Sequence, residues 1–205
     1  MILMWKKSLS TMNRRLVLLA ALLMAGVYFL PLWYISLSAP QYPEGLGMYI
    51  WINKLSGGTP YDLQNINLLN HYVGMEEIVS SSIPELLYMP YVLVYMIFGA
   101  AVTYFLPRLF MVAFGILNLG LVAAAGMADF WRWEYNYGHH LKPDAPIIVP
   151  GMAYQPPLLG CKQMLNIDAC SVPHTGAVIL LAVFGLLAYI VWSERKAFLS
   201  EKEQN

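Results

Sequence analysis

The chain has 205 residues, of which 59% are hydrophobic and only 12% are charged, and its formal net charge is zero. Soluble domains carry about 25% charged residues, so this composition excludes an ordinary soluble protein and predicts a polytopic membrane protein. The balanced charge also gives no broad basic field of the kind that attracts nucleic acid.

Four apolar runs are long enough to cross a bilayer, whose ~30 Å core needs about 20 helical residues. We expect spans at about 16–37, 86–106, 109–128 and 175–192, with two long loops at 38–85 and 129–173. The first run could be a cleaved signal peptide, but its apolar stretch is longer than usual, so we expect a retained helix. The predicted fold is all-α: a single membrane domain over 1–205, a four-helix bundle whose two loops form a cap.

The distribution of basic residues predicts which side of the membrane the loops face. Of the twelve lysines and arginines, only four fall in the loops, namely Lys54, Arg132, Lys142 and Lys162. Basic residues concentrate on the cytoplasmic side of membrane proteins. We therefore expect both termini in the cytoplasm and both loops on the outer side of the membrane.

The first loop contains an unusual polar segment. After a stretch at 46–55 that fits a short strand or an interfacial segment, residues 62–75 have the pattern of a short helix, with Asp62 at its start and Gly74 near its end. Within it, the string NLLNHYVGM runs over 67–75. In a helix, Asn67, His71 and Met75 would lie above one another on one face.

The second loop begins with an aromatic cluster at 130–137, which is typical of a belt at the membrane interface. Two adjacent histidines, His139 and His140, follow it. Five prolines between 143 and 157 then favour extended chain. Met152 lies in this proline-rich part and is a candidate ligand.

Soft metal ligands gather on the loop side of the predicted bundle. All four histidines, both cysteines, Met75, Met152 and Met164 lie there. Imidazole, thiolate and thioether groups suit copper, and thioethers favour Cu(I). The candidate ligands are His71, Met75, Met152, Cys161, Cys170 and His174.

Cys161 and Cys170 allow two interpretations. An oxidising compartment favours a disulfide between them. The alternative is a thiol pair that binds copper, although their spacing matches no strong metal motif. His174 stands at the entrance of the last span, where an ionisable group needs a partner, and Asp168 could be that partner.

The sequence contains no pattern typical of catalysis. It has no HExxH, CxxCH or GxSxG motif and no phosphate-binding glycine loop. We therefore expect a protein that is not an enzyme.

Two strings carry a family resemblance: NINLLNHYVGM at 65–75, and VPGMAYQPPLLG at 149–160 with KQMLN at 162–166. They resemble small four-span membrane proteins associated with the maturation of nitrous oxide reductase. The resemblance implies a location in the bacterial inner membrane with both loops in the periplasm. It further implies copper supply to, or assembly of, a periplasmic copper enzyme, with contacts to lipid and to another membrane or periplasmic protein. It also implies that the residues that matter are His71, Met75 and Met152, together with Asn67, Asn70, Gln163 and Asn166.

Three functions remain open from the sequence. The first is a periplasm-facing accessory protein that binds Cu(I) or docks a copper chaperone. The second is a structural or docking subunit of a larger respiratory or transporter complex, without metal. The third is an electron-transfer subunit that binds quinone or haem, with His139 and His140 at the interface.

Overall fold

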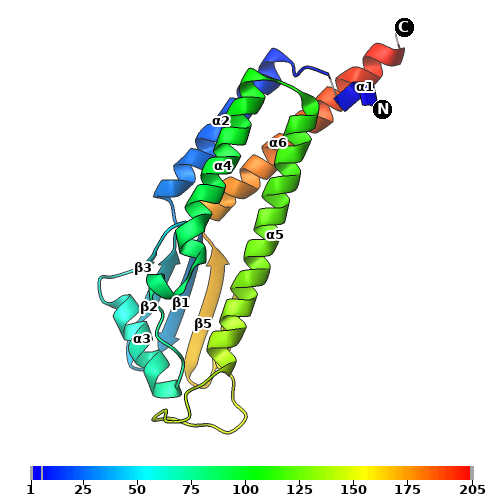
Figure 1. Cartoon of the computed structure of the whole chain (residues 1–205). Helices are drawn as coiled ribbons and strands as arrows, with labels where there is room; N and C mark the ends of the chain where they lie inside the picture. The colour runs from blue at the N-terminus through cyan, green and yellow to red at the C-terminus, as the bar shows by residue number, and fades with distance from the viewer. Residues whose placement is uncertain (1, 6, 204–205) are drawn as a thin grey trace.

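The computed structural model describes residues 2–5 and 7–203 and has two parts (Figure 1). One part is a bundle of long helices, and the other is a five-stranded sheet with a helix packed on it. We call the second part the sheet domain; it comprises 33–83 and 130–173. Helix α5 connects the two parts and runs alongside the sheet (Figure 1).

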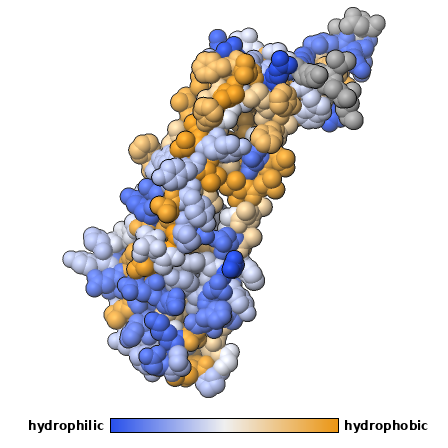
Figure 2. All heavy atoms as spheres, viewed as in Figure 1, coloured by the Kyte–Doolittle hydropathy of each residue, from blue (hydrophilic) through white to orange (hydrophobic). Residues whose placement is uncertain are grey.

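The bundle contains α2 (Thr11–Gly26), α4 (Glu85–Phe105), α5 (Leu109–His139) and α6 (Thr175–Glu203). Each of these, with η1 (Val27–Phe29) added to α2, is long and apolar enough to cross a membrane. Large apolar side chains such as Leu22, Phe98 and Leu181 are exposed on its surface. On the face seen in Figure 2, hydrophobic residues predominate over the bundle and hydrophilic ones over the sheet domain. A helix bundle that is apolar outside as well as inside is suited to lipid.

The predicted all-α fold is wrong, because the chain also forms a five-stranded antiparallel sheet. The strands are β1 (Trp33–Ala39), β2 (Tyr42–Ile50), β3 (Leu55–Gly57), β4 (Gly160–Met164) and β5 (Ile167–Pro173), in the order β3-β2-β1-β5-β4. The fold is therefore mixed α/β. Each of the two segments expected to be a loop contributes strands to this one sheet.

The apolar run at 16–37 was predicted as one membrane span, but it contains both a helix and a strand. Its helix ends at Gly26, and after Pro31 the chain becomes β1, the central strand, which pairs with β2 and β5. A central strand that is covered by other elements is apolar because it is buried, as a membrane span is. An apolar run alone therefore does not distinguish a buried strand from a membrane span. The residues Trp33, Tyr34 and Ile35 are good strand formers, and the proline breaks the helix before them.

Helix α5 extends beyond the predicted third span. Its 31 residues measure about 46 Å at 1.5 Å per residue, whereas a bilayer core is about 30 Å thick. The last ten residues therefore lie beyond the membrane-spanning segment. There, Phe130, Trp133 and Tyr137 pack into the core of the sheet domain. The aromatic cluster predicted as a loop at the interface is thus the end of a helix.

Helix α3 (Asp62–Val73) packs against the sheet beside β2, and the expected short helix at 62–75 ends two residues early. Its first residue, Asp62, accepts hydrogen bonds from the backbone amides of Gly47 (2.8 Å) and Thr59 (3.1 Å) and from the Thr59 hydroxyl. Burial alone would raise the pKa of Asp62, but these hydrogen bonds outweigh it and hold the pKa below its usual value. Asp62 thus ties α3 to β2 and to the β3–α3 turn.

Replacing Asp62 with alanine should lower the free energy of unfolding of the sheet domain by about 2 kcal/mol, since it leaves the buried Gly47 amide and the partly buried Thr59 amide without their charged acceptor. Chemical unfolding of the full chain in detergent, followed by tryptophan fluorescence, measures this change. Asp144→Ala, at an exposed carboxylate in the same domain, is the matched control. Equal stability of the two variants would contradict the role given to Asp62.

Candidate functional site

The NLLNHYVGM string is divided between α3 and the chain that follows it. The helix ends at Gly74, whose φ of 80° is in the left-handed region that favours glycine. Met75 therefore leaves the helix, and its amide donates to the Asn70 carbonyl (2.9 Å). Its side chain is buried, whereas His71 is exposed. The expected stack of Asn67, His71 and Met75 on one helix face does not form.

The two asparagines of the string differ in their contacts. The Asn67 side chain donates to the Ile78 carbonyl (3.0 Å) and accepts from the Ile78 amide (2.8 Å), so it holds segment 75–79 against α3. Asn70 is buried, and its Nδ2 atom has no hydrogen-bond partner in the described chain. Asn67 is thus explained by structure, and Asn70 is not.

An open groove of about 730 Å³ lies between α3 and the segment that follows it. Its lining includes Asn67, Leu68, His71, Met75, Glu77 and Lys142. His71 is on this groove, together with charged groups of both signs. The groove is a candidate surface for a partner protein or a hydrated ion.

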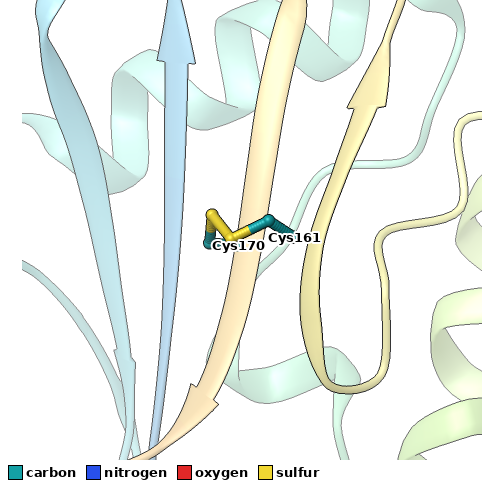
Figure 3. The surroundings of a disulfide bond; sticks show 2 residues. All are labelled: Cys161 and Cys170. Carbon is teal, nitrogen blue, oxygen red and sulfur yellow. A yellow bond between two sulfur atoms is a disulfide. The ribbon is translucent and has the colours of Figure 1, made fainter.

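The predicted cysteine ligands are joined to each other. Cys161 on β4 and Cys170 on β5 face each other in the hairpin and form a disulfide (Figure 3). Because alternate residues of a strand point to opposite faces, Cys170 lies on the face opposite to its buried neighbours Ala169 and Ser171. Neither sulfur is therefore a thiolate, and neither points to the core of the sheet domain.

Three further predicted residues, Gln163, Asn166 and His174, do not belong to the core of the sheet domain. Gln163, on β4, and Asn166, in the β4–β5 turn, are exposed. His174 lies where β5 leads into α6, with its ring 5.3 Å from that of Tyr49 and its Nδ1 3.0 Å from the Thr175 hydroxyl. The suggested partner of His174, Asp168, is six residues away along the chain, about 20 Å on an extended strand.

His139 and His140 also lack a shared site. They end α5 and remain exposed, and His139 stacks on Tyr135 with ring centroids 3.9 Å apart. Their ring nitrogens lie 2.9 Å and 3.2 Å from carbonyls one helical turn earlier. The histidines of the described chain therefore do not converge.

A small cavity of about 60 Å³ does bring sequence-distant residues together, under α3. Three methionines line it: Met48 from β2, Met75 from the chain after α3, and Met164 from the end of β4. Their side chains are 2%, 8% and 6% exposed. Met152 packs against the same apolar cluster without lining the cavity.

The polar groups of this cavity lack partners. In the part of the chain that the structure describes, five buried side-chain nitrogen and oxygen atoms have no hydrogen bond, and four of them belong to residues that line this cavity. They are both carboxylate oxygens of Glu134, the Asn70 Nδ2 and the Tyr154 hydroxyl. Buried polar groups are almost always satisfied, so four such atoms around one void indicate a missing occupant.

Glu134 is the most unusual residue of the site. It lies on α5 beyond the membrane-spanning segment and is fully buried, with 0% exposure. Burial raises the pKa of its carboxyl to about 7. A charged carboxylate at this position needs a cation or hydrogen-bond donors, and within the described residues its oxygens have no such partner.

Close backbone contacts place Tyr154 at the cavity. The Tyr154 amide donates to the Gly138 carbonyl (2.9 Å), and a Cβ atom on Gly138 would lie only 2.4 Å from the backbone nitrogen of Gln155. Only glycine at 138 allows the chain around 154 to approach α5 this closely. This contact seats the tyrosine against the end of the helix.

Glu134, Met48 and Tyr154 were not predicted from the sequence as site residues. A signal for Glu134 was present: positions 130, 133, 134 and 137 share one helical face, and an acid among three aromatics on that face is out of place. Because 130–137 was predicted to be an interfacial loop, its helical periodicity was not considered. Met48 and Tyr154 had no comparable signal, because their convergence depends on the sheet.

Within the described residues, no group of three or more histidine, cysteine, aspartate or glutamate side chains is placed to hold a metal ion. The cavity instead offers thioethers with a single carboxylate, a donor set that suits Cu(I) rather than a hard cation. No model of a known protein family matches the chain, and no curated protein sequence does.

Proposed function

We propose that this chain is a membrane-anchored accessory protein whose sheet domain faces the periplasm, binds Cu(I) and passes it to a copper enzyme during assembly, such as nitrous oxide reductase. One observation carries the proposal. Thioethers from three separate segments and a carboxylate without a partner line the same buried cavity.

The chemistry of the donors supports Cu(I) over other ions. Thioether sulfur is a soft ligand that favours Cu(I), whereas magnesium and calcium require several oxygen ligands. The disulfide agrees with an oxidising compartment outside the cytoplasm. The predicted histidine and cysteine ligands are dispersed, so the proposal rests on the methionines and not on that original set.

Titration of the full-length protein with Cu(I) tests the proposal. The protein is purified in detergent under an inert atmosphere and competes with a chromophoric Cu(I) chelator, and Zn²⁺ is titrated in parallel. We expect uptake of one equivalent of Cu(I) that excess Zn²⁺ does not displace. Failure to take Cu(I) from the weakest chelator would overturn the proposed function.

The proposed orientation places the sheet domain in the periplasm and both termini in the cytoplasm. The described chain has no free cysteine, so an introduced cysteine is a unique reporter. In intact cells, a membrane-impermeant maleimide should label Glu44→Cys and leave Glu203→Cys unlabelled until the membrane is permeabilised. The reverse labelling pattern would contradict the orientation.

The groove favours a second candidate function, a docking subunit without metal. It is open, about 730 Å³ in volume, and combines exposed apolar residues such as Leu68 with charged ones. Under this alternative, a stoichiometric partner purifies with the protein from native membranes in the absence of metal. Leu68→Glu then removes the partner while Met48→Leu, at a cavity residue that does not line the groove, retains it.

A further inference from the structure

We infer that the thioethers of Met48, Met75 and Met164 and the carboxylate of Glu134 are the ligands of the Cu(I) ion. This inference rests on the proposed function and specifies its site. It differs from the ligand set that the sequence indicated, of which only Met75 is retained.

The three thioethers reach the cavity from different parts of the fold. Met48 is paired with Ile35 in the β1–β2 ladder, and Met164 is paired with Ile167 next to the β4–β5 turn. Met75 comes from the chain that Asn67 and Gly74 fix at the end of α3. A ligand set held by two strands and a hydrogen-bonded segment is preorganised for one ion, since none of the three has to fold on binding.

Glu134 supplies the charge that the thioethers lack. A monovalent copper ion and one carboxylate cancel, so the filled site is neutral in an apolar enclosure where a lone charge would be costly. Both of its oxygens are buried and free of hydrogen bonds. The Tyr154 hydroxyl and the Asn70 amide, also without partners, belong to the same cavity lining and are the hydrogen-bond donors available to the carboxylate there.

The size of the cavity limits what can occupy it. A volume of about 60 Å³ is enough for one metal ion or a few water molecules, and too small for an organic cofactor. Water alone is the competing occupant. It would satisfy Glu134, Asn70 and Tyr154, but it gives no reason for three thioethers around the same void.

Met75 also connects the cavity with the surface. It lines both the buried cavity and the open groove that carries His71 and Glu77. An ion captured from the groove can therefore reach the cavity by exchange at the Met75 sulfur. His71 would then bind the ion in the groove, before the ion reaches the cavity, and would not be one of its final ligands.

The test uses substitutions that remove a ligand and keep its volume. Met48→Leu, Met75→Leu, Met164→Leu and Glu134→Gln are compared with Met152→Leu, which removes a thioether from the same apolar cluster outside the cavity. Cu(I) affinity is measured by chelator competition on the full-length protein in detergent. The midpoint of thermal unfolding checks that each variant folds.

Each cavity variant should lose at least about tenfold in Cu(I) affinity, as even substitution of an outer-shell partner does. The triple leucine variant should lose binding altogether, and Met152→Leu should bind as the wild type does. If the wild type binds and the folded triple variant binds equally well, the proposed function stands and this ligand set is wrong. If the wild type takes up no Cu(I), the proposed function itself fails and the cavity holds water.

A second measurement needs no substitution in the cavity. The chain has twelve methionines, and their ¹³C-labelled methyl groups give separate NMR signals. One equivalent of Cu(I) should shift the signals of Met48, Met75 and Met164 and leave that of Met152 in place. Shifts confined to other methionines would overturn the assignment, even if a cavity variant fails to fold.

Discussion

The metal-free sheet domain should lose stability as the pH rises from 5 to 8, and Glu134→Gln should abolish most of this loss. In the folded protein, burial raises the pKa of the Glu134 carboxyl from 4.5 to about 7. The folded state therefore holds a proton that the unfolded state has released. Proton binding stabilises the fold below pH 4.5, and this contribution disappears as the pH rises through about 7.

The expected size of this effect is about 3 kcal/mol, because each unit of pKa difference corresponds to about 1.4 kcal/mol. Thermal unfolding of the full chain in detergent at several pH values measures it. Glu44→Gln, at an exposed acid on β2, is the matched control and should keep the wild-type profile. A Glu134→Gln profile parallel to that of the wild type would show that this carboxyl titrates normally.

Removing the disulfide should produce the second large effect. Cys161 and Cys170 are nine residues apart, and a crosslink that closes a loop of this length stabilises a protein by about 3 kcal/mol. The bond also holds β4 to β5, and β4 carries Met164 at its end. The double variant Cys161→Ser with Cys170→Ser should therefore unfold at a clearly lower denaturant concentration than the wild type.

The same variant distinguishes the two roles that the sequence left open for the cysteines. At a temperature where it remains folded, it should bind Cu(I) with unchanged affinity, because the sulfurs lie on the face of the sheet away from the cavity. Asp168→Ser, an exposed change two residues from Cys170, controls for substitution in β5. Loss of Cu(I) binding without loss of stability would instead identify the cysteines as ligands.

The helices were predictable wherever an apolar run was long and uninterrupted. The spans expected at 109–128 and 175–192 lie within α5 and α6, and that expected at 86–106 matches α4 to within one residue at each end. The run at 16–37 failed because burial in a sheet and burial in lipid select the same residues. Its proline was the feature that separated helix from strand.

The candidate site was predictable only in part. The sequence drew attention to Met75 through its neighbours Asn67 and His71, and the structure gives those neighbours other positions: Asn67 holds the chain in place and His71 faces the groove. Glu134 and Met164 are thirty residues apart, and both are distant in sequence from Met48. Contacts of this kind follow from the strand order, which local patterns do not reveal.

The most direct test of the account is X-ray absorption at the copper K edge of the full-length protein loaded with one equivalent of Cu(I). The account predicts a first shell dominated by sulfur with one oxygen, and none of the outer-shell scattering that imidazole rings produce. A spectrum with imidazole scattering, or with nitrogen and oxygen alone, would contradict a site built from Met48, Met75, Met164 and Glu134.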